Sequence, residues 1–319
     1  MLVTTADVTP AVSTDLLTPG LTTQDKLEEE VGDEAVALTA EMKGPVWVIL
    51  GVFIAVACLI ALIVVLQTPS TNSLNNESNP HVLDGAPEAV DDMYLGCENE
   101  MMMVIDKYFQ KENVGKFKTA WKNAEKCSNK LHLADTALTK NHMQAICAYT
   151  SNDIYKEFNE AVRTGKNIYG SSFKFHYLHF WLTSAIQILK SEDKCITTYR
   201  RNDIVFTGKV NQTMRFGEFA SSSTKTELTK YGIETCFKIN TCLGAYLKDY
   251  TANGTKEEEV LIPPYETFKI THATVGLRYD TDLPDCKKVF ILKSVGKMSN
   301  LNCTLIRERS LLQMMQNMS

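Results

Sequence analysis

The pattern of hydrophobic and polar positions divides this chain of 319 residues around one uninterrupted apolar run. The run, PVWVILGVFIAVACLIALIVVL, occupies residues 45–66. A helix of this length spans roughly 30 Å, the thickness of the hydrocarbon core of a bilayer. A core helix of a globular protein rarely stays apolar on every face for so long. The run therefore predicts a transmembrane helix that acts as a signal-anchor.

The charges that flank the run predict its orientation. Lys26 and Lys43 precede it, whereas the first Lys or Arg after it is Lys107. Positive charge beside a membrane helix stays in the cytoplasm, so we expect a single-pass type II membrane protein whose main domain is extracellular or lumenal. If translation began at Met42, the run would instead resemble a cleavable signal peptide. It is longer than most signal-peptide cores, which favours the anchor.

The polar segments around the run complete the expected domain organisation. Residues 1–44 lack aromatic side chains and contain nine acidic residues against two lysines, which predicts a disordered cytoplasmic tail. Residues 67–90 are rich in Asn, Ser and Pro and are predicted to form a stalk. The folded domain is expected at residues 91–308, followed by a C-terminal tail at 309–319.

Within the folded domain, helical spacing comes first and strand-like segments follow. Apolar residues recur at helical intervals around residues 101–109, and HYLHFWLTSAIQILK carries one continuous apolar stripe. His176 and His179 lie on that second helix and are expected to be structural. Seven β-rich segments come later, separated by turn residues: CITTYR, DIVFTG, MRFGEFAS, CFKINTCLGAYL, EVLIP, TFKITHATV and KKVFILKSV. Helices followed by strands predict the α+β class.

Charge and motifs exclude several functions. The net charge is −5, but residues 1–44 carry −7, so the remainder is nearly neutral at +2. A nucleic-acid-binding domain usually shows a basic stripe, and none is visible. The sequence has no GxGxxG or Walker loop, which argues against a Rossmann or P-loop nucleotide site. It also offers no CxxC pair or histidine cluster with the spacing of metal ligands.

The cysteines support a secretory route. One of the nine, Cys58, lies in the apolar run. The other eight follow it, and an even number in an extracellular domain predicts disulfides. They are Cys97, Cys127, Cys147, Cys195, Cys236, Cys242, Cys286 and Cys303. Glycosylation sequons at Asn76, Asn211, Asn253 and Asn302 are consistent with the same route.

The segment KEEEVLIPP, residues 256–264, is the first candidate for chemistry. If it forms a strand, alternation places Glu257 and Glu259 on one face, roughly 7 Å apart, and Glu258 on the other. Paired carboxylates on one face can act on a sugar-like substrate by acid–base or electrostatic catalysis. Taken alone, however, the segment is more typical of a solvated charge run that begins a strand.

Two further segments change that interpretation. Arg200 ends the β-rich run TTYR, and Ser221–Ser223 end the segment FGEFASSS. The order of arginine, Ser-x-Ser and Glu-x-Glu resembles that of the arginine-specific mono-ADP-ribosyltransferases of the vertebrate ecto-enzyme family. The resemblance extends over essentially the whole domain. Its other motifs are DDMYLGC, AYTSNDIYKEFNEAVR, FHYLHFWLTSAI, TCLGAYLKDY, EEEVLIPPYETF and SNLNC.

The resemblance implies a fold, a reaction and a set of roles. The fold is a helical part followed by a β-rich NAD-binding core, and the reaction transfers one ADP-ribose from NAD to an arginine side chain without a metal. Glu259 matches the catalytic glutamate, Glu257 the glutamate that engages the acceptor guanidinium, and Ser221 the serine that holds the catalytic glutamate. Arg200 matches the arginine that anchors NAD. The residues expected to contact NAD are Arg200, Arg201, Ser221, Phe237 and Glu259.

The resemblance also implies two disulfides, Cys97–Cys303 and Cys195–Cys242, and shows three departures. Many relatives have Gly where this chain has Arg201. A Phe-Phe pair of relatives reads Cys236-Phe237 here, and a sequon at Asn253 lies four residues before Glu257.

We therefore expect a membrane-tethered enzyme that ADP-ribosylates arginine on extracellular or lumenal proteins. Two alternatives stay open: an enzyme that chiefly hydrolyses NAD, and a catalytically weak surface protein of the same fold.

Overall fold

The computed structural model describes residues 80–319, apart from 130–131, 133–134, 191–193, 277–279 and 318–319. The predicted tail, the apolar run at 45–66 and most of the predicted stalk lie outside these residues. Among the residues described, no helix is both long enough and apolar enough to cross a bilayer.

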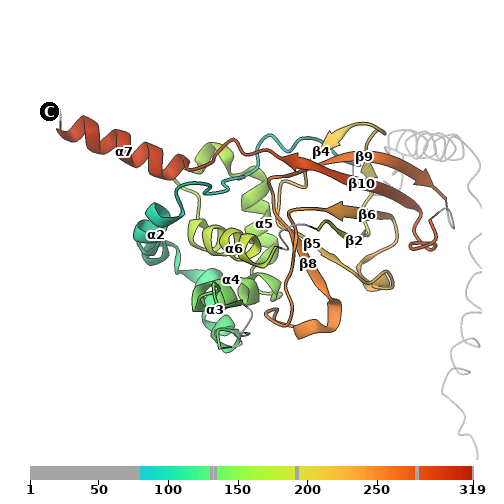
Figure 1. The fold of residues 1–319 in the computed structure, drawn as a ribbon, viewed down its shortest axis with the longest axis horizontal. Coiled ribbons are helices and arrows are strands. Elements are labelled where there is room, and N and C mark those ends of the chain that lie inside the picture. The colour runs from blue at the N-terminus through green and yellow to red at the C-terminus, as the bar shows by residue number, and fades with distance from the viewer. Residues whose placement is uncertain (1–79, 130–131, 133–134, 191–193, 277–279, 318–319) are drawn as a thin grey trace, which may run out of the picture. The chain divides into compact units, whose positions relative to one another are not determined.

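The helices come first, as predicted, and gather beside the sheet (Figure 1). They are α2 (Glu98–Glu112), α3 (Gly115–Ala124), α4 (Lys140–Thr150), α5 (Tyr155–Thr164) and α6 (His176–Leu189), with 3₁₀ turns η1 (Glu125–Cys127) and η3 (Lys166–Ile168).

The predicted apolar helix is α6, which is buried along most of its length. Around it lies a cluster of aromatic rings, in which Trp121 meets Tyr177 edge to face at 5.0 Å between centroids. Each large apolar side chain that is fully buried contributes roughly 1.5–3 kcal/mol to folding, so this cluster holds the helices together. Phe219 and Leu261, from the sheet side, belong to the same core.

Strands follow in the second half of the domain. They are β2 (Ile196–Asn202), β4 (Thr213–Met214), β5 (Ala220–Ser223), β6 (Thr235–Thr241), β7 (Ala245–Tyr246), β8 (Glu259–Ile262), β9 (Glu266–Val275) and β10 (Lys288–Lys297). These form one sheet in the order β4-β9-β10-β6-β2-β5-β8-β7. Two short strands, β1 (His81–Val82) and β3 (Phe206–Thr207), pair separately. The 3₁₀ turns η4 (Thr229–Tyr231) and η5 (Gly254–Glu257) lie between strands.

Neighbouring strands in this sheet are antiparallel, except that β10 runs parallel to β6. Alternate residues of the central strands point into a second apolar core, where Phe237 stacks on Phe290 at 5.7 Å. The architecture is the mixed helix-and-sheet type that the sequence predicts. In this order β2, β5 and β8 are consecutive neighbours, which brings three distant chain segments to one place.

The regular structure extends beyond both sequence-based boundaries. Leu83, Ala89 and Val90 are buried, although residues 67–90 were assigned to the stalk. Gly217 makes room for this segment: its φ is +65°, and a Cβ there would lie 2.5 Å from the Cβ of Ala86. At the other end, helix α7 (Thr304–Asn317) runs through the predicted tail and projects from the body (Figure 1).

Four disulfides join the eight cysteines of the described domain. Cys97–Cys303 and Cys195–Cys242 confirm the two predicted pairs. The other two pairs, which the sequence left open, are Cys127–Cys147 and Cys236–Cys286. The first pair fastens the beginning of the domain to its end. Asp91 reinforces this closure, since its carboxylate accepts hydrogen bonds from the backbone of Asn300 and Leu301 and pairs with buried Arg215.

Candidate active site

One pocket of about 330 Å³ lies where β2, β5 and β8 meet the C-terminal end of α4 and the segment that follows it. The pairing of the strands explains the convergence, because Tyr199 lies opposite Ser223 and Ser223 opposite Glu259. The predicted residues Arg200, Arg201, Ser221, Glu257 and Glu259 all line this pocket. Lining residues that were not predicted include Tyr149, Tyr155, Asn159, Tyr199, Lys225, Tyr231 and Asn253.

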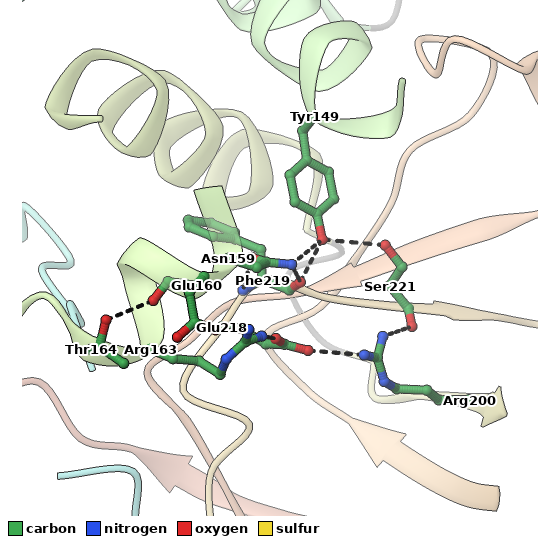
Figure 2. A network of polar contacts seen from close by, with 9 residues as sticks. All are labelled: Tyr149, Asn159, Glu160, Arg163, Thr164, Arg200, Glu218, Phe219 and Ser221. Atoms are coloured by element: carbon green, nitrogen blue, oxygen red, sulfur yellow. Dashed lines mark hydrogen bonds and ion pairs between the residues drawn. The ribbon is translucent and has the colours of Figure 1, made fainter. Parts of the chain in front are cut away.

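Arg200 is held in place from two sides. One terminal nitrogen donates to the carbonyl oxygen of Ser221 at 2.7 Å, and the other donates to Oε1 of Glu218 at 2.9 Å (Figure 2). Glu218 is buried and also pairs with Arg163 on α5. Each terminal guanidinium nitrogen has a second N–H, so the side chain can still donate to an anionic ligand. Glu218 thus holds the Arg200 guanidinium at the pocket and leaves some N–H groups of that guanidinium able to donate to a ligand.

Ser221 is tied to the helical layer by Tyr149. The Tyr149 hydroxyl donates to the carbonyl oxygen of Phe219 and lies 3.4 Å from Oγ of Ser221. Asn159 on α5 donates to the same hydroxyl at 3.1 Å and accepts a hydrogen bond from the backbone N–H of Phe219. Figure 2 shows these residues converging on β5 from the helices. The arrangement fixes the strand that carries Ser221 relative to α4 and α5.

Glu259 is the carboxylate that the pocket perturbs most clearly. Desolvation raises its pKa from 4.5 to about 7, with a smaller upward contribution from the neighbouring charge of Glu257. A hydrogen bond from Ser221 and the charge of Arg200 oppose this rise. A perturbed carboxylate in a cleft is a typical mark of a functional site. Near neutral pH, both protonation states of Glu259 are therefore accessible.

Glu257 and Glu259 reach the pocket by a different backbone route from the predicted one. The strand begins only at Glu259, and Glu257 ends the 3₁₀ turn η5. Glu258 between them adopts the left-handed conformation, with φ 45° and ψ 52°. Strand alternation is therefore the wrong explanation for their shared direction. The left-handed residue turns the chain, and the side chain of Glu258 bonds instead to the hydroxyl of Thr224.

Two residues that the sequence analysis did not single out contact Glu257. Lys230 Nζ lies 2.5 Å from its Oε1, and the Tyr231 hydroxyl donates to the same oxygen at 2.6 Å. Desolvation would raise the pKa of Glu257, but these two hydrogen bonds outweigh it, and the net shift is downward. Glu257 therefore stays ionised at pH values at which Glu259 is partly protonated.

Two of the three departures from the family pattern, Arg201 and Cys236-Phe237, fall in different places. Arg201 lines the pocket, but its guanidinium is engaged with both carboxylate oxygens of Asp285, at 2.8 and 2.9 Å, and with the carbonyl oxygen of Thr226. Phe237, predicted to contact NAD, does not line the pocket. It is fully buried in the second apolar core, where Phe216 covers it with an edge-to-face contact at 5.7 Å. Phe216 also lies beneath the Arg200 guanidinium, at 5.9 Å.

Signals for the unpredicted residues were present in part. Tyr149, Asn159 and Arg163 belong to AYTSNDIYKEFNEAVR, and Glu218 belongs to FGEFASSS, both recognised as family motifs. Their pairings join segments 55–72 residues apart, which no local pattern reveals. His176 and His179 lie in the helical core, bonded to Glu112 and Tyr94. In the part of the chain that the structure describes, no group of three His, Cys, Asp or Glu is placed to hold a metal ion.

Comparisons with known proteins identify the family of this chain. Residues 83–289 match the family model of NAD:arginine ADP-ribosyltransferases. Ecto-ADP-ribosyltransferase 4 of Homo sapiens is 35% identical over 248 residues, which cover 71% of this chain and 74% of that protein. GPI-linked NAD(P)(+)–arginine ADP-ribosyltransferase 1 of Mus musculus is 33% identical over 267 residues, covering 76% and 79%.

A solved structure gives the same result. The eukaryotic mono-ADP-ribosyltransferase ART2.2, determined as a mutant in complex with NAD, has a TM-score of 0.58 and 32% identity, covering 70% of this chain and 99% of its own. The fold and the pocket therefore define a mono-ADP-ribosyltransferase. The chain belongs to the NAD:arginine ADP-ribosyltransferase family. Its reaction is the transfer of a single ADP-ribose from NAD, the co-substrate, to arginine, with release of nicotinamide.

Proposed function

We propose that Glu259, Glu257, Ser221 and Arg200 carry out this reaction in the pocket described above, on arginine side chains of extracellular or lumenal proteins. The observation that supports the proposal best is the convergence of two carboxylates in different electrostatic states beside one anchored guanidinium. The two carboxylates suit two tasks, one toward NAD and one toward the acceptor.

Glu259 is the residue proposed to act on NAD. Breaking the nicotinamide–ribose bond develops positive charge on the ribose, and a fixed carboxylate in a water-poor site stabilises that charge. The ionised form does this, and the positive charge of the nicotinamide ring of NAD favours the same form before the bond breaks. Ser221, through its hydrogen bond to Glu259, holds the carboxylate in place.

Arg200 is proposed to anchor the pyrophosphate of NAD. A guanidinium stays charged at all relevant pH values, and its planar fork matches phosphate oxygens. The bonds to Glu218 and to Ser221 keep the side chain oriented before NAD arrives, which lowers the entropic cost of binding. Arg201 lines the same pocket, and Asp285 engages its side chain.

Glu257 is proposed to bind the acceptor guanidinium. An ionised carboxylate is the natural partner of a guanidinium, because the two can form a pair of parallel hydrogen bonds. The downward pKa shift of Glu257 keeps it ionised when Glu259 begins to protonate. Ionised Glu257 can orient the acceptor nitrogen toward the ribose carbon from which nicotinamide departs.

The proposed location is a membrane-tethered ectodomain in type II orientation, with residues 45–66 as the anchor. Four disulfides support passage through an oxidising compartment. Antibody staining of a tag at the N-terminus would test the orientation. A type II protein is stained only after cells are permeabilised, whereas staining of intact cells contradicts it.

The reaction itself is tested by incubating the purified domain with labelled NAD and agmatine, a small guanidine. Formation of ADP-ribosyl-agmatine supports the proposal. NAD hydrolysis is the second candidate activity, favoured by the occupation of Glu257 by Lys230 and Tyr231. Free ADP-ribose as the sole product would support that alternative, and a folded protein that leaves NAD intact would contradict both.

A further inference from the structure

The carboxylate proposed to receive the acceptor already has a cation beside it. Lys230 Nζ lies 2.5 Å from Oε1 of Glu257, and Tyr231 donates to that same oxygen at 2.6 Å. The Lys230 ammonium also lies 4.7 Å from the centroid of the Tyr231 ring, which favours a cation there. The Lys230 side chain is 60% exposed and that of Glu257 20%, so the pair lies at the mouth of the site.

The segment that carries Lys230 is fastened to the turn that carries Glu257. At its start, Ser223 Oγ donates to the carbonyl oxygen of Glu257, and Thr224 bonds to Glu258 through both backbone and side chain. Lys225 Nζ then donates to the carbonyl oxygen of Lys256 at 3.0 Å. These contacts hold the two segments together, so the Lys230 ammonium stays close to Glu257.

Arg201 fixes the same segment from the other side. Its guanidinium donates to the carbonyl oxygen of Thr226 at 2.6 and 2.9 Å while it pairs with Asp285. The residue that replaces a glycine of many relatives therefore braces the segment that leads to Lys230. A cation held on a braced segment has a high effective concentration at its partner, well above that of a free molecule in solution.

From this geometry we propose that Lys230 sets the affinity of the acceptor position: it occupies Glu257 as a tethered ammonium, and an acceptor must displace it to react. The inference rests on the proposed role of Glu257. Displacement weakens the binding of every cationic acceptor by the same factor, so the affinity that remains depends on how the acceptor contacts the carboxylate. A lysine ammonium offers a single-point contact, whereas a guanidinium can bond to both carboxylate oxygens at once. Guanidinium acceptors therefore bind in spite of Lys230, and simple amines bind weakly.

The test compares Lys230→Ala with Lys256→Ala, which removes an exposed lysine from the turn that carries Glu257 and leaves the Lys230–Glu257 pair intact. For each protein we would measure the KM for agmatine, the Ki of 1,5-diaminopentane as an inhibitor of transfer, and the rate of NAD hydrolysis without acceptor. Lys230→Ala should lower both the KM and the Ki by roughly two- to fivefold, the usual strength of an exposed ion pair. Hydrolysis should change by less than twofold, because water does not have to displace Lys230.

The outcomes separate this inference from the proposed function. Transfer to agmatine by the wild-type protein, with a KM that is unchanged or higher in Lys230→Ala, overturns the proposed role of Lys230 alone. An equal fall in Lys256→Ala also overturns it, since general charge would then explain the effect. If the wild-type protein makes no ADP-ribosyl-agmatine, both the proposed function and this inference fail. Lys230→Gln, which keeps the side-chain length without the charge, should behave as Lys230→Ala does.

Discussion

Glu112 at the end of α2 and Glu259 at the start of β8 are both withdrawn from water, yet their surroundings differ. Glu112 accepts hydrogen bonds from the backbone N–H groups of His176 and Tyr177, at 3.1 and 3.0 Å, and from the His176 ring at 2.6 Å. These two backbone N–H groups belong to the first turn of α6, where N–H groups have no acceptor within their own helix. Protein donors thus fill the acceptor sites of Glu112.

Glu259 keeps its carboxylate open to the pocket. Ser221 donates one hydrogen bond to this carboxylate. The charge of Arg200 stabilises its ionised form, and the charge of Glu257 destabilises that form. Desolvation dominates this balance and raises the pKa of Glu259 to about 7. The comparison teaches that burial alone does not mark a catalytic carboxylate. The informative feature is a desolvated carboxylate whose remaining acceptor sites face a cavity.

The largest effect is expected for Glu259→Gln. The amide keeps the size of the side chain but cannot balance the positive charge that develops on the ribose, so NAD cleavage should fall at least about a hundredfold. Transfer and hydrolysis should fall together, because both require the same bond to break. A labelled-NAD assay measures both, and a hydrolysis rate within tenfold of the wild type would contradict the role of Glu259.

Glu112→Gln is the matched substitution in the helical core. The amide presents an NH₂ group to donors that need an acceptor, and a buried unsatisfied donor costs about 2 kcal/mol. The free energy of unfolding in urea should fall by that amount, while kcat for NAD cleavage changes less than threefold. A Glu112→Gln protein of normal stability but low activity would reverse the assignment of the two carboxylates.

The pH dependence of NAD cleavage should report the pKa of Glu259. The reaction uses the ionised carboxylate, so kcat/KM for NAD should be half-maximal near pH 7, level off about one unit above it and fall about tenfold per pH unit well below it. An acidic limb centred near pH 4.5 would show that desolvation does not control this group. The buffer series requires a stability control by fluorescence, so that unfolding is not mistaken for titration.

Glu257→Gln should separate the two outcomes of the reaction. It removes the charge that holds an acceptor guanidinium but leaves Glu259 in place, so the ratio of transfer to hydrolysis should fall roughly tenfold. The absolute rate of hydrolysis should change little. Equal losses of transfer and hydrolysis would mean that Glu257 also supports the bond-breaking step.

The smallest effect concerns stability. Between pH 4.5 and about 7, the folded state binds the Glu259 proton more tightly than the unfolded state does, so the stability of the folded state falls as pH rises through this window. Glu259→Gln has no such proton. Its Tm should therefore exceed that of the wild type at pH 8, and the difference should shrink toward pH 5. The opposite trend would mean that ionised Glu259 is stabilised in the fold.

The sequence predicts the order of helices and strands well, because that order depends on local periodicity. Its Arg, Ser and Glu motifs also end in the same pocket, since β2, β5 and β8 are neighbours. The sequence does not predict the features that depend on contacts between residues far apart in the chain. The bond from Glu112 to His176 spans 64 residues and that from Arg201 to Asp285 spans 84, and neither leaves a local pattern.

Sequence patterns also do not predict the backbone conformation or the burial of single residues. Glu258 adopts positive φ, which an alternation rule does not allow, and the 3₁₀ turn before it replaces the expected strand. Phe237 lies on a strand as predicted, but Phe216 covers it, and only the packed core shows this.

The disulfide between Cys97 and Cys303, 206 residues apart, makes most of the domain a covalent ring. A protease that cuts one loop inside this ring opens it but releases neither half. A cut before Cys97 instead frees the whole ring from whatever precedes it. If the proposed anchor tethers the domain to a membrane, the first event is nicking in place and the second is shedding, and electrophoresis with and without a reducing agent tells them apart.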